Sequence, residues 1–242
     1  MQYGPFKMGI QSYSLRGQKL SDALRTTHQL GIGFWEAYPE HIPTENLVRR
    51  IYEHRKALAD SKVRLLGYGV VSFGADEKAA LRTFQFAKYM GIETISADPA
   101  PESFRYLAKM ANEYKVRIAI HNHGPGSRYD RIEHLEAVMT KEPKIIGLCV
   151  DTGHFLRSGV DPSAVVRRWP DRVYGAHLKD VKDRRAWTVL GQGDLDTVGF
   201  LKALRSARFN GVLALEYEEN PDNPVPDIQA CLAYTREAVR RV

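Results

Sequence analysis

Short apolar runs alternate with longer segments of helical period along the whole chain, and the pair recurs eight times. Most apolar runs are nearly continuous, which is typical of parallel strands that are covered on both faces. We expect strands at 8–12, 33–37, 63–71, 94–97, 117–121, 147–151, 173–178 and 212–217. We expect helices at 21–30, 45–60, 77–90, 101–114, 132–141, 162–168, 197–207 and 226–242.

Eight strand–helix pairs in 242 residues give about 30 residues per pair, which is the scale of a (β/α)8 TIM barrel. The sequence contains no linker, low-complexity segment or shift of composition that would divide it. We therefore predict an α/β fold with a single TIM-barrel domain over residues 1–242. The alternative is an open, doubly wound sheet, but no Gly-x-Gly-x-x-Gly turn follows the first strand.

Local signals mark several helix ends. Asp161 precedes Pro162 and is expected to cap the helix that starts there, and Asp196 is expected to cap the next one. Three glycines follow predicted helices, where a left-handed residue is favoured: Gly31, Gly91 and Gly211.

The composition is ordinary for a globular protein, with 43% hydrophobic and 26% charged residues. Cys149 and Cys231 have no partner at metal-ligand spacing, so we expect two small buried side chains and no disulfide scaffold. The net charge of +6 comes from scattered basic residues, which is more typical of solvated helix faces than of a nucleic-acid patch. Without a long apolar stretch or a signal-peptide core, the chain is expected to be soluble and cytoplasmic.

Polar residues close five of the eight predicted strands. In a TIM barrel the carboxyl ends of the strands form the active site, so these side chains are expected to gather at one end of the barrel. They are Glu36 on the second strand, His121 and His123 on the fifth, Asp151 and His154 on the sixth, His177 and Lys179 on the seventh, and Glu216 and Glu218 on the eighth.

Four of these residues belong to consecutive strands and are therefore expected to converge: His121, Asp151, His177 and Glu216. Imidazole and carboxylate ligands together suit Mn²⁺, Co²⁺, Zn²⁺ or Fe²⁺ better than Mg²⁺. We expect one divalent metal ion at this place, with Mn²⁺, Co²⁺ or Zn²⁺ preferred to Mg²⁺.

Four segments at or after these strand ends resemble the xylose-isomerase-like TIM-barrel superfamily of sugar phosphate isomerases and epimerases. They are Asp151-Thr-Gly-His154, His177-Leu-Lys-Asp180, Gly191-Gln-Gly-Asp194 and Leu215-Glu216-Tyr217-Glu218. The superfamily also includes ketose 3-epimerases, inosose dehydratases, hydroxypyruvate isomerases and endonuclease IV repair enzymes. The resemblance implies a divalent ion held by Glu, Asp, His and Glu from strands five to eight.

The fifth strand departs from that pattern. The family often has Glu-Asn-His there, whereas this chain has His121-Asn122-His123. In the epimerases, the glutamates of strands five and eight face the substrate from opposite sides, so the loss of one weakens the case for that mechanism. His121 either binds the metal or carries a proton near neutral pH, where an imidazole titrates.

The remaining roles follow from position and resemblance. Glu216 is the candidate base, and His121, His123 and His154 are candidate acids. Lys179 either neutralises an enolate or phosphate, or pairs with Asp180. Substrate contacts are expected from Glu36, His123 and Glu218. Four aromatic side chains are close enough in sequence to stack on a sugar, but packing is the favoured interpretation of each: Tyr13, Trp35, Tyr68 and Trp187.

The favoured hypothesis is a metal-dependent isomerase or epimerase that transfers a proton next to the carbonyl of a small polyhydroxy substrate, which is a sugar, a sugar phosphate or an inositol-type compound. The alternatives are an inosose-dehydratase-like lyase, an endonuclease IV-like nuclease and a sugar-binding barrel without turnover. The nuclease is disfavoured because those enzymes need three metals and further histidines. We expect neither nucleic acid nor membrane as a partner, and a homodimer is compatible with the sequence.

Overall fold

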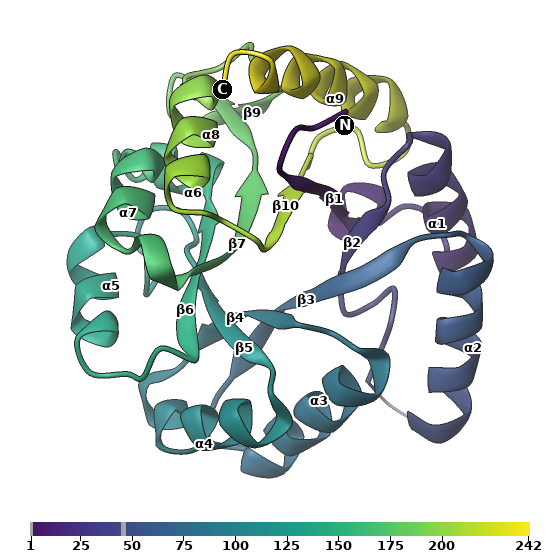
Figure 1. The fold of residues 1–242 in the computed structure, drawn as a ribbon, viewed down its shortest axis with the longest axis vertical. Helices are drawn as coiled ribbons and strands as arrows, with labels where there is room; N and C mark the ends of the chain where they lie inside the picture. The colour runs from purple at the N-terminus through teal and green to yellow at the C-terminus, as the bar shows by residue number, and fades with distance from the viewer. Residues whose placement is uncertain (1, 45–46) are drawn as a thin grey trace.

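In the computed structural model, which describes residues 2–44 and 47–242, eight parallel strands close into a barrel (Figure 1). Their order around the barrel is β1, β2, β3, β4, β5, β6, β7 and β10, and β10 pairs back onto β1. This closure confirms the TIM barrel and excludes the open sheet. The strands are β1 (Lys7–Gln11), β2 (Phe34–Ala37), β3 (Arg64–Phe73), β4 (Thr94–Pro99), β5 (Arg117–His121), β6 (Ile146–Asp151), β7 (Val173–Leu178) and β10 (Val212–Leu215).

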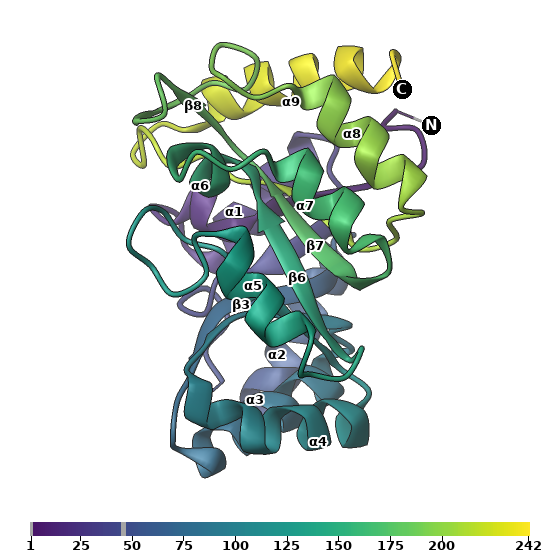
Figure 2. The same cartoon turned by 90° about the vertical axis from the view of Figure 1, so that its left-hand side faces the viewer.

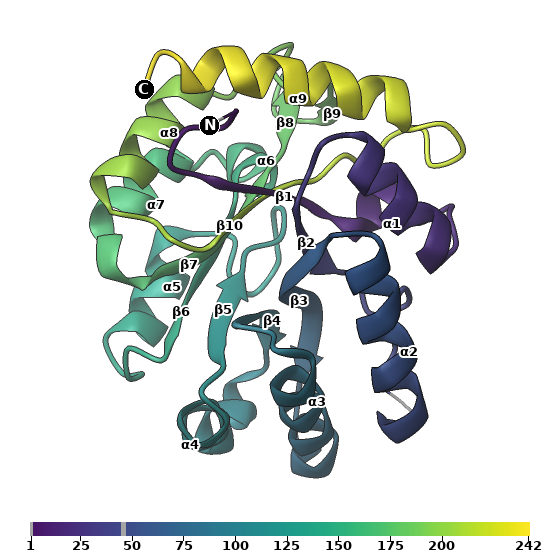
Figure 3. The same cartoon turned by 45° about the vertical axis from the view of Figure 1, so that its right-hand side comes forward.

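Helices form an outer layer around the strands. Figure 2 shows α5 and α7 beside β6 and β7, and Figure 3 shows α1, α2 and α3 on the other side. The α-helices are α1 (Leu20–Gln29), α2 (Leu47–Asp60), α3 (Glu77–Met90), α4 (Phe104–Tyr114), α5 (Ile132–Met139), α6 (Thr152–Arg157), α7 (Pro162–Arg168), α8 (Thr197–Ser206) and α9 (Val225–Val239). Three short 3-10 helices are η1 (Ser12–Leu15), η2 (Pro101–Ser103) and η3 (Pro170–Arg172). The first two residues of the helix predicted at 45–60 lie outside the described residues.

The expected helix caps are present. The side chain of Asp161 accepts a hydrogen bond from the backbone N–H of Ser163, and Asp196 caps α8 in the same way. Gly31 and Gly91 are left-handed, with φ of 73° and 72°. The predictions for Asp161, Asp196, Gly31 and Gly91 are therefore confirmed. Hydrogen bonds at these helix ends supply partners to backbone groups that have none within the helix.

The prediction for Gly211 was wrong. The left-handed residue after α8 is Arg208, with φ of 52°. Gly211 is needed for a different reason, since a Cβ atom at this position would lie 2.0 Å from the carbonyl oxygen of Tyr174. The glycine therefore permits a close approach of two chain segments at the start of β10.

Two elements near the barrel mouth were not predicted. The first is α6, which begins directly after β6, and the second is an antiparallel hairpin of β8 (Asp180–Lys182) and β9 (Ala186–Thr188). The hairpin turns through Asp183 and Arg184, which both have positive φ, at 54° and 56°. Such a turn usually carries Asn-Gly or Asp-Gly, so this sequence gives no turn signal.

The described part of the chain supports the expectation for the cysteines and shows the core. Cys149 and Cys231 are free and buried, as expected. Apolar side chains from the strands and the surrounding helices form an extended core, which fixes the strand ends relative to one another, and Leu66, Val212 and Ala214 form a smaller separate cluster. Within the described residues, we find no helix with the length and apolar character that a membrane crossing requires.

Candidate metal centre and active site

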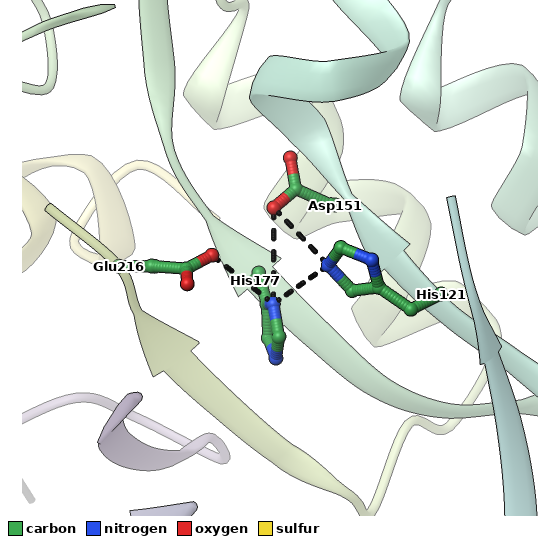
Figure 4. A group of neighbouring side chains, drawn as sticks. All are labelled: His121, Asp151, His177 and Glu216. Carbon is green, nitrogen blue, oxygen red and sulfur yellow. Dashed lines mark hydrogen bonds and ion pairs between the residues drawn. The ribbon is translucent and has the colours of Figure 1, made fainter. Parts of the chain in front are cut away.

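Four side chains meet at the carboxyl ends of neighbouring strands (Figure 4). His121 and Asp151 are the last residues of β5 and β6, His177 lies one residue before the end of β7, and Glu216 follows β10. Strand register places Asp151 opposite His177 and His121 opposite Cys149. The barrel therefore brings together four side chains that are far apart in sequence.

The cluster is tight and buried. The Nε2 atom of His121 lies 3.1 Å from Nδ1 of His177 and 3.5 Å from Oδ2 of Asp151. The same Nδ1 lies 3.3 Å from Oε2 of Glu216, and the four ligand-type atoms all lie within 4.8 Å of one another (Figure 4). The sequence predicted this convergence, and the geometry agrees with it.

The donor atoms suit a divalent cation. Oδ2 of Asp151 and Oε2 of Glu216 are buried and have no hydrogen bond of good geometry, and their charged neighbours are the ammonium of Lys179 and the imidazoles of the cluster. Two imidazole nitrogens face each other at 3.1 Å, so at most one of them can carry the proton between them. Two nitrogens and two carboxylate oxygens form a set that first-row divalent metals accept.

Local structure aims Asp151 and fixes the end of β5. Oδ1 of Asp151 caps α6 by accepting a hydrogen bond from the backbone N–H of His154 at 2.7 Å, which leaves Oδ2 facing the cluster. The side chain of Asn122 bonds both the N–H and the carbonyl of Asp151, at 2.9 and 3.0 Å. Sequence reasoning missed this role of Asn122, although its place between two site histidines was a signal.

Lys179 is held by carboxylates. Its Nζ atom lies 3.2 Å from Oδ2 of Asp151 and 2.7 Å from Oε2 of Glu216, and it also contacts Glu218. Burial alone would lower the pKa of Lys179, but these negative charges raise it, so the ammonium stays charged. A fixed positive charge therefore lies beside the cluster.

The alternative pairing of Lys179 with Asp180 was wrong. The carboxylate of Asp180 accepts hydrogen bonds from four backbone N–H groups, including those of Gly191 and Gly193. Asp180 points away from Lys179 because its oxygens organise the 190–195 loop. That loop follows the β8–β9 hairpin and leads into α8.

Burial and neighbouring charges together set the pKa values of the site histidines and of Glu216. It lowers the pKa of His121 to about 3 and that of His154 to about 4, so both are neutral at neutral pH. Burial alone would also lower the pKa of His177, but Cys149 and the carboxylates of Glu36 and Glu216 raise it. For Glu216, burial favours the neutral acid, yet Lys179 and His177 lower its pKa and keep it a carboxylate.

A cavity of about 330 Å³ opens beside the cluster. Six predicted site residues line it: His121, His123, His154, Lys179, Glu216 and Glu218. Tyr13 and Tyr38 also line it and form an edge-to-face pair with ring centres 5.0 Å apart. Sequence reasoning missed Tyr38 and the cavity-lining Gln11, since neither stands in a recognisable motif.

The other predicted residues lie outside this lining. Glu36 is 2% exposed and is bonded to His177, so the structure gives it a buried partner in place of the expected substrate hydroxyl. Trp35 and Tyr68 are buried in the core, as the packing interpretation expects. The ring of Trp187 packs against the ring of His154. Nζ of Lys179 lies over the Trp187 ring, 4.7 Å from the ring centre.

The family follows from comparison with known sequences. The profile described as xylose isomerase-like TIM barrel matches residues 24–238. The chain belongs to this family. The resemblance seen in the strand-end motifs is thereby confirmed, and the barrel is the architecture that the family name describes.

Two relatives of known name that match the chain are both inosose dehydratases. An inosose dehydratase of Clostridium tetani (strain Massachusetts / E88) is 24% identical over 217 residues, which cover 82% of this chain and 72% of that protein. An inosose dehydratase of Lacticaseibacillus casei is 27% identical over 139 residues, which cover 50% of this chain and 46% of that protein. The chain thus matches about half the length of this second relative.

Solved structures share the fold. The IolI protein with a bound zinc atom aligns at a TM-score of 0.76 and 19% identity, covering 96% of this chain and 97% of that chain. L-ribulose 3-epimerase aligns at a TM-score of 0.75 and 16% identity, covering 97% of this chain and 95% of that chain. At these identities the likeness concerns the barrel alone.

Proposed function

We propose that the chain is a metal-dependent enzyme that removes a proton from the carbon next to the carbonyl of a small polyhydroxy compound. The first candidate is a sugar isomerase or epimerase, and the second is a lyase of the inosose dehydratase kind. The observation that carries the proposal is the cluster of four ligand-type atoms within 4.8 Å of one another, beside a cavity lined with titratable groups.

His121, Asp151, His177 and Glu216 hold the metal in this proposal, and the zinc carried by IolI supports it. When bound, a divalent ion withdraws electron density from a carbonyl oxygen and so acidifies the neighbouring C–H bond. The two nitrogen ligands favour Mn²⁺, Co²⁺ or Zn²⁺ over Mg²⁺. His121 is neutral, and the tautomer with its proton on Nδ1 offers the Nε2 lone pair for this use.

Glu216 and Lys179 handle the charge that proton removal creates. Glu216 is a carboxylate at the cavity wall and accepts the proton from carbon. Lys179 lies 2.7 Å from Oε2 of Glu216 and keeps its positive charge, so it stabilises the negative charge that develops on a substrate oxygen. Both groups are fixed before the substrate arrives, which removes the cost of reorganising them.

The imidazoles of His123 and His154 also line the cavity. Strand β5, which leads to His123, is separated from β10 by β6 and β7. His154 is neutral at neutral pH because burial lowers its pKa to about 4, so it takes a proton from a substrate hydroxyl and returns it later. An epimerase needs a second acid–base group besides Glu216, and because His121 holds the metal in this proposal, His123 or His154 takes that role.

The dehydratase candidate rests on one comparison and one chemical argument. Curated relatives that match the chain are named inosose dehydratases, one of them over 82% of this chain. Elimination of water also needs one base on carbon and one proton donor for the departing hydroxyl, which Glu216 and a histidine supply without a second carboxylate. In that reaction the C–H and C–O bonds break, a C=C bond forms, and water leaves.

The test follows exchange at carbon. The metal-loaded protein is incubated in deuterated water with a panel of ketoses and inososes, and NMR records the loss of the C–H signal next to the carbonyl. We expect exchange with at least one substrate, and product analysis then separates isomerisation, epimerisation and dehydration. Cleavage of abasic-site DNA with no exchange on any panel member would contradict the proposal and favour the nuclease.

A further inference from the structure

Glu36 is a buried carboxylate for which the chemistry proposed above has no role. It lies on β2, is 2% exposed, and does not line the cavity. Its Oε1 atom lies 3.0 Å from Nε2 of His177, whereas Nδ1 of the same ring faces Asp151 and Glu216. The ring of His177 therefore connects Glu36 to the metal cluster.

Three donors from three strands converge on this one oxygen. Oε1 of Glu36 accepts hydrogen bonds from Nε2 of Gln11 at 3.1 Å and from Oγ of Ser96 at 2.6 Å, besides facing His177. The amide of Gln11 is itself oriented, because its Nε2 also donates to the carbonyl of Gly69 and its oxygen accepts from the N–H of Tyr13. An oxygen that receives this many donors is best supplied by a carboxylate.

The backbone leaves room for Glu36 inside the barrel. A Cβ atom at position 67 would lie 3.0 Å from Cγ and 3.1 Å from Oε2 of Glu36, so Gly67 provides the space that this side chain fills. The register between β2 and β3 also shifts between Trp35 and Glu36. The placement of the carboxylate thus depends on features of two strands.

We propose that Glu36 is a positioning residue of the metal centre: it accepts the Nε2–H of His177 and thereby leaves the Nδ1 lone pair free to bind the metal between Asp151, Glu216 and His121. This inference rests on the proposed metal-dependent function. A carboxylate behind a ligating imidazole fixes the tautomer and ring orientation, and loss of such a partner typically weakens metal affinity by about 10–100-fold. Glu36 acts on the metal only through His177.

The test compares Glu36→Gln with Glu93→Gln, which removes the same charge at an exposed residue just before β4. Chelator-competition titrations give the affinity for Zn²⁺ and Co²⁺, and thermal unfolding without metal checks the fold. We expect Glu36→Gln to bind each metal about 10–100-fold more weakly, and Glu93→Gln to match the wild type. Glu36→Asp, which keeps the charge on a shorter side chain, should recover part of the loss.

A second readout needs no variant. In long-range ¹⁵N–¹H spectra of the zinc-loaded wild type, we expect His177 to carry its proton on Nε2 and to show that proton far downfield. If Glu36 had only a structural role, its replacement would lower the unfolding temperature, and His177 would have no reason to carry its proton on Nε2. A proton on Nδ1, or equal zinc affinity of wild type and Glu36→Gln, would overturn the inference while the metal site stands. A wild type that binds no divalent metal would overturn the proposed function as well.

Discussion

At the scale of single residues, His121 decides the charge of the proposed ligand set. Asp151 and Glu216 supply two negative charges, and both imidazole ligands are neutral when they bind a metal. The family pattern implies a glutamate at this position, which would make the set more negative and harder. The neutral imidazole therefore sets the metal preference proposed here.

We predict that His121→Glu shifts metal preference towards Mg²⁺ and Mn²⁺. The added carboxylate supplies a hard oxygen ligand and one more negative charge, whereas Zn²⁺ and Co²⁺ lose an imidazole. Competition between metals, followed by elemental analysis, measures the change against the wild type. If His121 only carries protons and does not bind the metal, the preference stays the same and turnover alone falls.

The sequence was sufficient to predict that the four candidate metal ligands converge, but not to predict where the side chain of Glu36 lies. His121, Asp151, His177 and Glu216 close consecutive apolar runs, and the carboxyl ends of neighbouring parallel strands must meet. Glu36 closes such a run too, yet its side chain lies behind His177 and outside the cavity lining. Depth inside a barrel depends on strand tilt and stagger, which no local pattern encodes.

At the scale of elements, the barrel strands were predictable because most are nearly continuous apolar runs that alternate with helices. The β8–β9 hairpin was not, since its strands have three residues each and its turn has no glycine. Helix α6 was not predicted because its first residues belong to the Asp151–His154 motif, which the sequence pattern places at the end of a strand. Both missed elements border the site, where Trp187 of β9 packs against His154 of α6.

The pairing of β5 with β6 at the site depends on Asn122, and Asn122→Ala tests this. The change removes two hydrogen bonds and leaves the buried N–H and carbonyl of Asp151 without these partners. We expect unfolding free energy to fall by about 2–3 kcal/mol and metal affinity to fall with it. Denaturant unfolding and metal titration measure both.

Asn112→Ala is the control, because that amide makes an exposed bond to the carbonyl of Ala108 within α4. It should change unfolding far less and leave metal binding unaltered. An Asn122→Ala protein with wild-type metal affinity would show that the ends of β5 and β6 hold their places without this contact.

At the scale of the whole molecule, the positive net charge of the chain is not reflected in the residues that line the cavity. The chain carries +6, yet Lys179 is the one Lys or Arg among the described residues that line the cavity. Its ammonium is already paired with Asp151, Glu216 and Glu218. A phosphate entering this cavity would have no unpaired lysine or arginine on the lining to meet it, and an unpaired buried charge is costly.

We therefore predict that an uncharged sugar or inosose is preferred to its phosphate ester. The ratio of kcat/KM for a matched pair should favour the uncharged compound by about tenfold or more, which corresponds to about 1.4 kcal/mol. Competition of each compound for the same active protein provides the comparison. A preference for the phosphorylated member would mean that a cation from outside the cavity lining reaches the substrate.

The most direct test of the account is the metal content of the protein purified without chelator. We predict one divalent ion per chain in the wild type, and a strong loss in Asp151→Ala and Glu216→Gln, because each variant removes a carboxylate from the cluster. Asp98→Asn, a change at an exposed ion pair with Arg128, should keep the full metal content. Equal metal content in the wild type and both cluster variants would contradict the metal centre.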